Sequence, residues 1–218
     1  MQIEFEGPAG RLEGLLEGPD ESPRAAVVFA HPHPLLGGGG SMHTKGVYQG
    51  AKGLVRIGCA VLRFNFRGVG RSAGTFDEGV GERGDFTAAT DFMAARFPGV
   101  PIWAAGFSFG SWIALETGAA DPRVSMLIGI APPWTFRRNG QETPREGYSW
   151  PNTLASDKPK FFVQGESDEV CAIQDMWTYY GKLREPKELV VIDAANHLFE
   201  GHAPEVGEAL EELLGDYE

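Results

Sequence analysis

From residue 25 onward, short apolar runs alternate with helix-like patterns, and this alternation constrains the fold more than any other feature. Residues 25–30 read as a buried strand. Between such runs, apolar residues recur at spacings of three and four, as in Phe86, Ala89 and Met93. Continuous apolar strands separated by helices indicate a parallel sheet covered on both faces. Further strands are expected at 60–66, 102–105, 124–130, 160–164 and 189–192.

The two remaining parts of the chain have different patterns. Residues 2–6 and 11–17 alternate apolar with charged side chains around a Gly-Pro turn, which predicts an antiparallel hairpin at a sheet edge. Residues 132–159 show no periodicity and hold several aromatic residues and prolines. We therefore expect a single α/β domain over residues 1–218, with about eight mostly parallel strands. Residues 132–159 would form an irregular loop, too short for a full lid domain.

A Gly-x-Ser-x-Gly pentapeptide, residues 106–110, falls between a predicted strand and a predicted helix. That position suits a sharp strand-to-helix turn, in which the glycines avoid crowding and the serine oxygen stands above the sheet. The helix begins at once, so the backbone N–H of Phe109 can face an oxyanion. We predict that Ser108 is a nucleophile.

A serine hydroxyl needs a base to take its proton, normally a histidine that a carboxylate supports. Only His197 and His202 follow Ser108 in the chain. His197 comes a few residues after the last predicted strand, at the same sheet edge as the serine, whereas His202 falls near the start of the last helix. We therefore favour His197 as the base.

The supporting acid is expected in the loop after the strand at 160–164. Asp168 is the preferred candidate, and Glu166 and Glu169 are the alternatives, because the sequence does not show which carboxylate points inward. The loop after the first buried strand should supply a second N–H for an oxyanion. Proline has no N–H, which leaves His33 and Leu35, and we favour Leu35.

These motifs resemble those of small, lidless α/β-hydrolases related to dienelactone hydrolases, most closely a bacterial family of predicted, esterase-like hydrolases. The resemblance implies the α/β-hydrolase fold and places that family's triad on Ser108, Asp168 and His197. Where dienelactone hydrolases carry a cysteine nucleophile, this chain has a serine. The likeness covers almost the whole chain and rests on residues 31–43, 63–72, 106–110, 130–133, 164–170 and 196–197.

The expected activity is hydrolysis of carboxylic esters with short-to-medium acyl chains, through an acyl-enzyme on Ser108. Thioesterase, lactonase and peptidase or amidase chemistry use the same triad and stay open, as does a catalytically silent binding protein. The segment 132–159 either wraps the site or only covers core. On the first reading, the substrate-binding residues are His33, Leu36, Trp134, Phe136 and Trp150.

Composition excludes several other classes of protein. Thirty acidic against 19 basic residues argue against nucleic acid and anionic membrane surfaces as partners. The two cysteines cannot form a disulfide framework, and no signal peptide or membrane span is visible, so we expect a cytoplasmic protein. We expect no cofactor and no metal, a small-molecule ester as the partner, and leave a homodimer open. Gly68–Ala73 matches a dinucleotide fingerprint but lacks the helix that such a motif opens.

Overall fold

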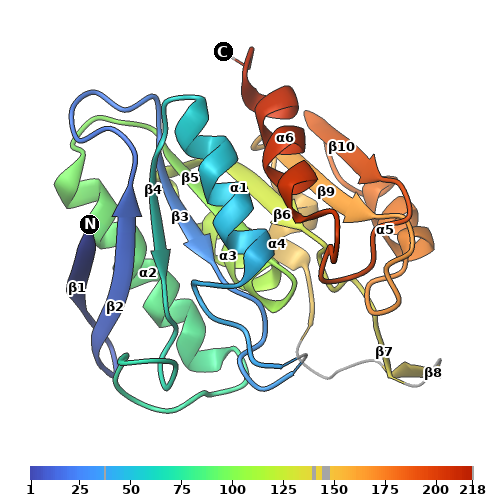
Figure 1. The fold of residues 1–218 in the computed structure, drawn as a ribbon, viewed down its shortest axis with the longest axis horizontal. Helices are drawn as coiled ribbons and strands as arrows, with labels where there is room; N and C mark the ends of the chain where they lie inside the picture. The colour runs from blue at the N-terminus through green and yellow to red at the C-terminus, as the bar shows by residue number, and fades with distance from the viewer. Residues whose placement is uncertain (37, 139–140, 144–147, 218) are drawn as a thin grey trace.

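The computed structural model describes residues 1–36, 38–138, 141–143 and 148–217. A mixed sheet runs through the centre of the molecule (Figure 1). Its strands are β1 (Gln2–Gly7), β2 (Gly10–Glu17), β3 (Ala26–Ala30), β4 (Ala60–Phe64), β5 (Ile102–Phe107), β6 (Val124–Ile130), β9 (Lys160–Gly165) and β10 (Lys187–Ile192).

The spatial order of these eight strands is β1-β2-β4-β3-β5-β6-β9-β10. β1 and β2 form an antiparallel hairpin, β2 is antiparallel to β4, and all the other neighbours are parallel. The predicted fold class, a mostly parallel sheet with an N-terminal antiparallel hairpin, is therefore confirmed. The strands β4, β3, β5, β6, β9 and β10 are parallel to one another, so their carboxyl ends meet at one edge of the sheet.

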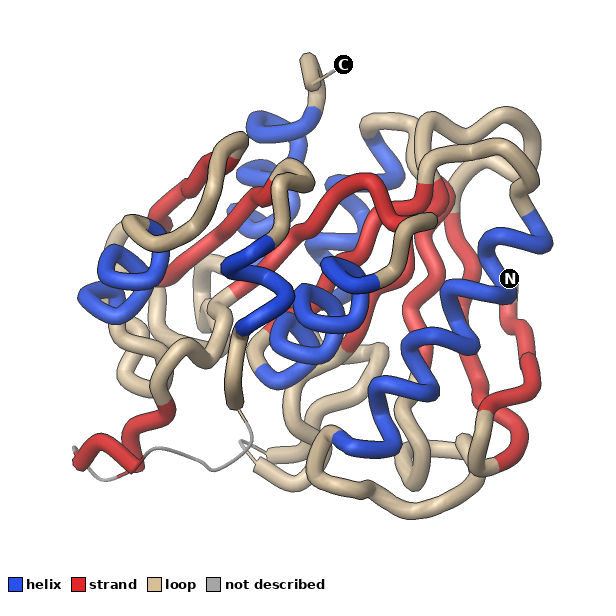
Figure 2. The backbone as a smooth tube through the Cα atoms, turned by 180° about the vertical axis from the view of Figure 1, so that it is seen from behind, coloured by secondary structure: helices blue, strands red, loops and turns tan. Residues whose placement is uncertain are grey.

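Helices cover both faces of the sheet (Figures 1 and 2). On one face, α1 (Lys45–Arg56) packs against α6 (Ala203–Leu214). On the other face lie α2 (Val80–Arg96) and α3 (Phe109–Ala120), joined toward the C-terminal strands by α4 (Pro151–Ala155) and α5 (Ile173–Tyr180). None of the helices in the described part of the chain has the length and apolar character of a membrane-spanning segment.

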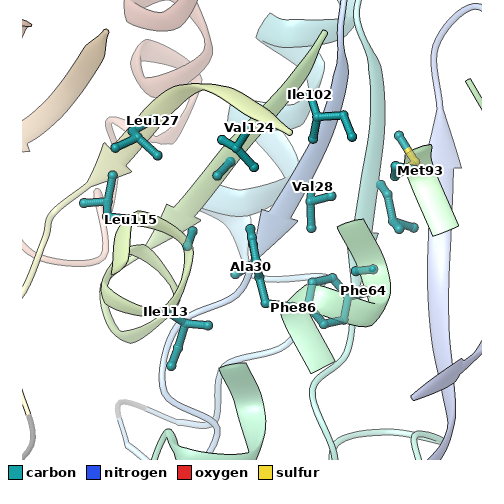
Figure 3. Packing of buried hydrophobic residues seen from close by; sticks show 14 of the residues in the cluster. Val28, Ala30, Phe64, Phe86, Met93, Ile102, Ile113, Leu115, Val124 and Leu127 are labelled. Atoms are coloured by element: carbon teal, nitrogen blue, oxygen red, sulfur yellow. The ribbon is translucent and has the colours of Figure 1, made fainter. Parts of the chain in front are cut away.

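The strand β3 shows how the sequence divides the core between these two faces. Successive side chains of a strand point to opposite sides. Val28 and Ala30 accordingly join the apolar cluster under α2 and α3, where Figure 3 shows them near Phe86. Val27 and Phe29 belong to the cluster under α1 and α6. All five positions of β3 are fully buried, as a central strand covered on both faces requires.

Residues 132–159 contain more structure than the sequence predicted. Two short strands, β7 (Phe136–Arg138) and β8 (Gln141–Thr143), form an antiparallel pair, and α4 follows before β9. These elements have three to five residues each, too few for a periodic pattern to appear. Gly68 and Gly70, by contrast, sit in a turn with positive φ angles, and no helix opens there before Val80, as expected.

Candidate active site

Ser108 stands in a strained turn between β5 and α3. Its φ and ψ angles are 52° and −122°, a conformation that non-glycine residues rarely adopt. A side chain at Gly106 would overlap the carbonyl oxygen of Gly110, and one at Gly110 would overlap the carbonyl oxygens of Ala30 and His31. Both flanking glycines are thus required by close backbone contact, which is the physical reason for the pentapeptide.

Ser108, His197 and Asp168 form one continuous chain of hydrogen bonds. The Oγ atom of Ser108 lies 2.9 Å from Nε2 of His197, and Nδ1 of His197 lies 2.9 Å from Oδ2 of Asp168. The three residues follow β5, β10 and β9, so the parallel sheet brings them together from three separate loops. An ionised carboxylate can only accept, so His197 donates from Nδ1 and accepts the serine proton at Nε2. All three side chains are buried.

The carboxylate of Asp168 has four hydrogen-bond donors around it. Its Oδ1 accepts from the backbone N–H groups of Val170 (2.8 Å) and Cys171 (2.7 Å). Its Oδ2 accepts from His197 and from the side-chain amide of Gln164, at 3.0 Å. The carboxylate is therefore fixed in the orientation that serves His197. Gln164 is a neighbour of the triad that the sequence reasoning missed, because a glutamine at the end of a strand carries no distinguishing signal.

The two alternative acids bind backbone instead of the imidazole. Oε2 of Glu166 accepts from the N–H of Ala194 at 3.0 Å, and Oε2 of Glu169 accepts from the N–H of His197 at 3.2 Å. Both carboxylates thus brace the loop that carries the histidine. His202 is remote from this arrangement and pairs with Glu205 on α6.

The structure does not place Leu35 where the sequence reasoning expected it. Its side chain is 70% exposed, and its N–H donates to Nδ1 of His33 at 3.1 Å, because the chain turns back after Pro34. Leu35 is also absent from the cavity lining, whereas His33 lines the cavity together with Ser108 and Phe109. Phe109 is the first residue of α3, so no carbonyl of its own helix can bond its N–H. Of the two residues that the sequence left open for the second N–H, the structure therefore places His33, and not Leu35, at the cavity beside Ser108 and Phe109.

His31 anchors the loop that carries His33. Its Nδ1 donates to the carbonyl of Pro32 at 2.7 Å, and its Nε2 accepts from the N–H of Phe66 at 3.1 Å. Desolvation by complete burial lowers the pKa of His31 to about 4. The imidazole is thus neutral at physiological pH and ties β3 to the chain that follows β4.

A cavity of about 690 Å³ opens next to Ser108. His33 and Leu36 line it, as predicted from the sequence. Tyr148 also lines it and packs edge-on against Trp112 with the ring centroids 4.5 Å apart, a contribution that the sequence reasoning did not single out. The lining is completed by Pro32, Gly39, Gly40, Ser41, His43, Thr44, Lys45, Phe109, Pro133, Glu169, Val170, His197, Leu198 and Glu200.

The structure does not bring Trp134 and Trp150 to this cavity. Both indoles are 3% exposed and belong to the core under α3. Trp134 stacks on Tyr179 with ring centroids 4.8 Å apart, and its Nε1 donates to the sulfur of Met176 at 3.1 Å. The expectation that they bind substrate is corrected, because these rings complete the core. The side chain of Phe136 lies outside the described residues.

One group of potential metal-binding side chains occurs among the described residues, and it includes two members of the triad. The donor atoms of Asp168, Cys171 and His197 all lie within 4.8 Å of one another. Burial and the neighbouring carboxylates raise the pKa of the Cys171 thiol well above its usual value, so the sulfur is protonated in the metal-free protein. The histidines at 31, 33 and 43 do not form such a group in the described residues.

Comparison with known proteins places this site in a family. The sequence model of the family described as "Serine aminopeptidase, S33" matches residues 21–152. An uncharacterized protein of Rickettsia prowazekii is 34% identical, over 98% of this chain and 88% of the relative.

Two solved structures show the same likeness over nearly the whole chain. An alpha-beta serine hydrolase homologue from Coxiella burnetii has a TM-score of 0.86 at 35% identity and covers 98% of this chain and 97% of its own. An α/β serine hydrolase without a lid from Xanthomonas campestris has a TM-score of 0.81 at 31% identity, over 97% and 92%. Est1E of Butyrivibrio proteoclasticus, solved with ferulic acid bound, shares the fold with a TM-score of 0.81 at 20% identity, over 97% of both chains. The chain therefore belongs to the serine aminopeptidase S33 family of α/β serine hydrolases.

Proposed function

We propose that this protein hydrolyses carboxylic esters of short-to-medium acyl chain by acyl transfer to Ser108. The observation that carries this proposal is the hydrogen-bonded chain from Ser108 through His197 to Asp168, which ends on an open cavity. A binding protein on the same fold would have no use for a strained serine aligned with a base. The fold shared with an esterase that has been solved with ferulic acid is consistent with ester chemistry.

The proposed reaction begins when Oγ of Ser108 attacks the ester carbonyl while its proton passes to Nε2 of His197. Asp168 holds the imidazole in the required tautomer and stabilises the imidazolium that forms. The imidazolium then protonates the leaving alkoxide, and an acyl-enzyme remains. A water molecule, deprotonated by the same Nε2, attacks the acyl carbon and regenerates Ser108.

The tetrahedral oxyanion needs donors that already point at it before the reaction. We assign this role to the backbone N–H groups of Phe109 and His33, two residues that line the cavity together with Ser108. The N-terminus of α3 adds a favourable dipole at the same point. Losing one such donor typically costs on the order of 100-fold in rate.

The cavity supports a substrate larger than an acetate ester. Its volume of about 690 Å³ lies inside the range of roughly 300 to 1,000 Å³ that is usual for small-molecule sites. Apolar side chains such as Leu36, Tyr148 and Val170 give it a wall for an acyl chain. No lid domain covers the site in the part of the chain that the structure describes, so the ester can enter directly from solvent.

A peptidase activity is the second candidate, and the name of the family favours it. An aminopeptidase must recognise a protonated α-amino group, and the carboxylates of Glu169 and Glu200 line the cavity. Both of them already accept hydrogen bonds from the His197 loop, Glu169 from His197 and Glu200 from Asn196. We therefore place ester hydrolysis first.

The test is hydrolysis of p-nitrophenyl esters from C2 to C12, and of amino-acid p-nitroanilides, by the native protein and by Ser108→Ala. We expect ester turnover that the substitution abolishes, with an optimum at short-to-medium chains. Faster cleavage of anilides than of esters would favour the peptidase. Ester turnover that survives in Ser108→Ala would refute the assignment of the nucleophile.

A further inference from the structure

Cys171 is a buried thiol beside the catalytic carboxylate, and the proposed acyl transfer gives it no role. Its Sγ lies within 4.8 Å of donor atoms of both Asp168 and His197, and all three side chains are buried. A thiolate, an imidazole and a carboxylate are the ligands that zinc prefers in proteins. The backbone N–H of Cys171 bonds Asp168 at 2.7 Å, which keeps the thiol in this place. We propose that Asp168, Cys171 and His197 bind a zinc ion that switches the hydrolase off.

The spacing of the three donors suits a small ion after modest side-chain rotation. With Zn–S near 2.3 Å and Zn–N near 2.0 Å, a tetrahedral zinc ion holds its sulfur and nitrogen ligands about 3.5 Å apart. Ligand atoms no more than 4.8 Å apart therefore need to close by about 1.3 Å at most. The side-chain amide of Gln164 lies beside this group, because its Nε2 donates to Asp168. The Oε1 atom of the same amide is buried and has no hydrogen-bond partner among the described residues. A cation bound nearby would stabilise this oxygen electrostatically.

The route to this group starts at the substrate cavity. Glu169 and Val170, which directly precede Cys171, line the cavity, and so does His197. Glu169 is exposed and carries a carboxylate that can first attract a divalent cation. The ion then needs to pass only this wall of the cavity to reach the sulfur.

Zinc at this place would inhibit by removing the base and not by filling the cavity; this consequence rests on the proposed function. The nitrogen of His197 that faces Asp168 is Nδ1. Zinc bound there displaces the Nδ1 proton, which moves to Nε2, and the thiol proton is released to solvent. An imidazole with its proton on Nε2 cannot accept the proton of Ser108.

The experiment measures zinc binding and zinc inhibition separately. Zinc chloride is titrated at chelator-buffered free concentrations into the native protein, Cys171→Ala and Cys171→Ser. Cys59→Ala is the matched control, because Cys59 is a second buried thiol, in the apolar cluster under α1 and α6, and does not belong to the group of Asp168, Cys171 and His197. Binding is read by calorimetry and by the sulfur-to-metal absorption band of bound cobalt, and inhibition by p-nitrophenyl butyrate turnover relative to each variant's own metal-free rate.

We expect one zinc ion per native chain, with binding and inhibition sharing one midpoint, and no inhibition by magnesium. Both midpoints should rise at least 10-fold in Cys171→Ala and Cys171→Ser and stay unchanged in Cys59→Ala. Equal inhibition of the native protein and Cys171→Ala, or a cobalt complex without the sulfur band, would overturn the proposed site. If the native protein turns over no ester, the proposed function fails while the binding arm still decides the site.

Discussion

The neutral state of His31 makes the stability of the protein depend on pH in a calculable way. Its pKa is about 4 in the folded protein, against 6.5 for an ordinary histidine. As pH falls below 6.5, the unfolded chain takes up a proton that the folded protein refuses, so the free energy of unfolding decreases. The loss continues down to about pH 4, where the folded protein binds the proton as well. Well above pH 6.5, His31 is neutral in both states and none of this stability is lost.

The size of the effect follows from the difference between the two pKa values. A shift from 6.5 to about 4 corresponds to about 3 kcal/mol in total, since one pKa unit is worth about 1.4 kcal/mol. By pH 5, about 2 kcal/mol of this should already be lost. For a domain of this size that is a large fraction of the net stability.

The test compares the native protein with His31→Gln, whose amide can donate and accept but cannot titrate. Urea unfolding followed by tryptophan fluorescence gives the free energy of unfolding of both proteins at pH 7.5 and at pH 5. Other groups that titrate in acid, such as Glu13 and Asp121, contribute equally to both and cancel. The advantage of the native protein should shrink by about 2 kcal/mol between the two pH values. Parallel pH dependences would show that His31 titrates normally, and the argument from burial would fail.

Three further substitutions test other parts of the structure. Gln164→Met removes a donor to the Asp168 carboxylate, and a hydrogen bond to a charged group is worth about 1.5 kcal/mol or more, so kcat/KM for p-nitrophenyl butyrate should fall about 10-fold. Trp134→Ala should lower the free energy of unfolding in urea by about 3 to 5 kcal/mol, whereas Tyr148→Ala should mainly raise KM for the longer esters. The reverse pattern would indicate that Trp134 binds substrate. Lys160→Met removes a buried ammonium that donates hydrogen bonds to three carbonyl oxygens. The free energy of unfolding, measured by thermal denaturation, should fall by about 3 kcal/mol.

The sequence was sufficient for the features that local backbone geometry imposes. The glycines at 106 and 110 are required by contacts that admit no side chain, so the pentapeptide identified the turn and Ser108 directly. The position of His197 followed from the topology, because loops after parallel strands meet at one sheet edge. The first argument uses one strand end and the second uses the order of parallel strands, and neither needs knowledge of how distant side chains pack.

The features that depend on turn direction or on long-range packing could not be predicted. His33 and Leu35 both carry an N–H, and only the fold of the chain after Pro34 shows that Leu35 turns away from the cavity. In the same way, the sequence does not show that Trp134 and Trp150 lie in the core, since an aperiodic segment can be buried as well as exposed. Aromatic residues in such a segment are weak evidence for a binding site.

The separation of the triad along the chain has a consequence for synthesis on the ribosome. Ser108 precedes His197 by 89 residues, and His197 follows β10, the last strand to join the sheet. A nascent chain that ends before residue 197 can form the strained turn at Ser108 but lacks His197, the proposed base. Helix α6 must also still pack against α1, near the start of the domain. Under the proposed mechanism, turnover begins only once the C-terminal part of the chain has been made, and hydrolysis would then report completed co-translational folding.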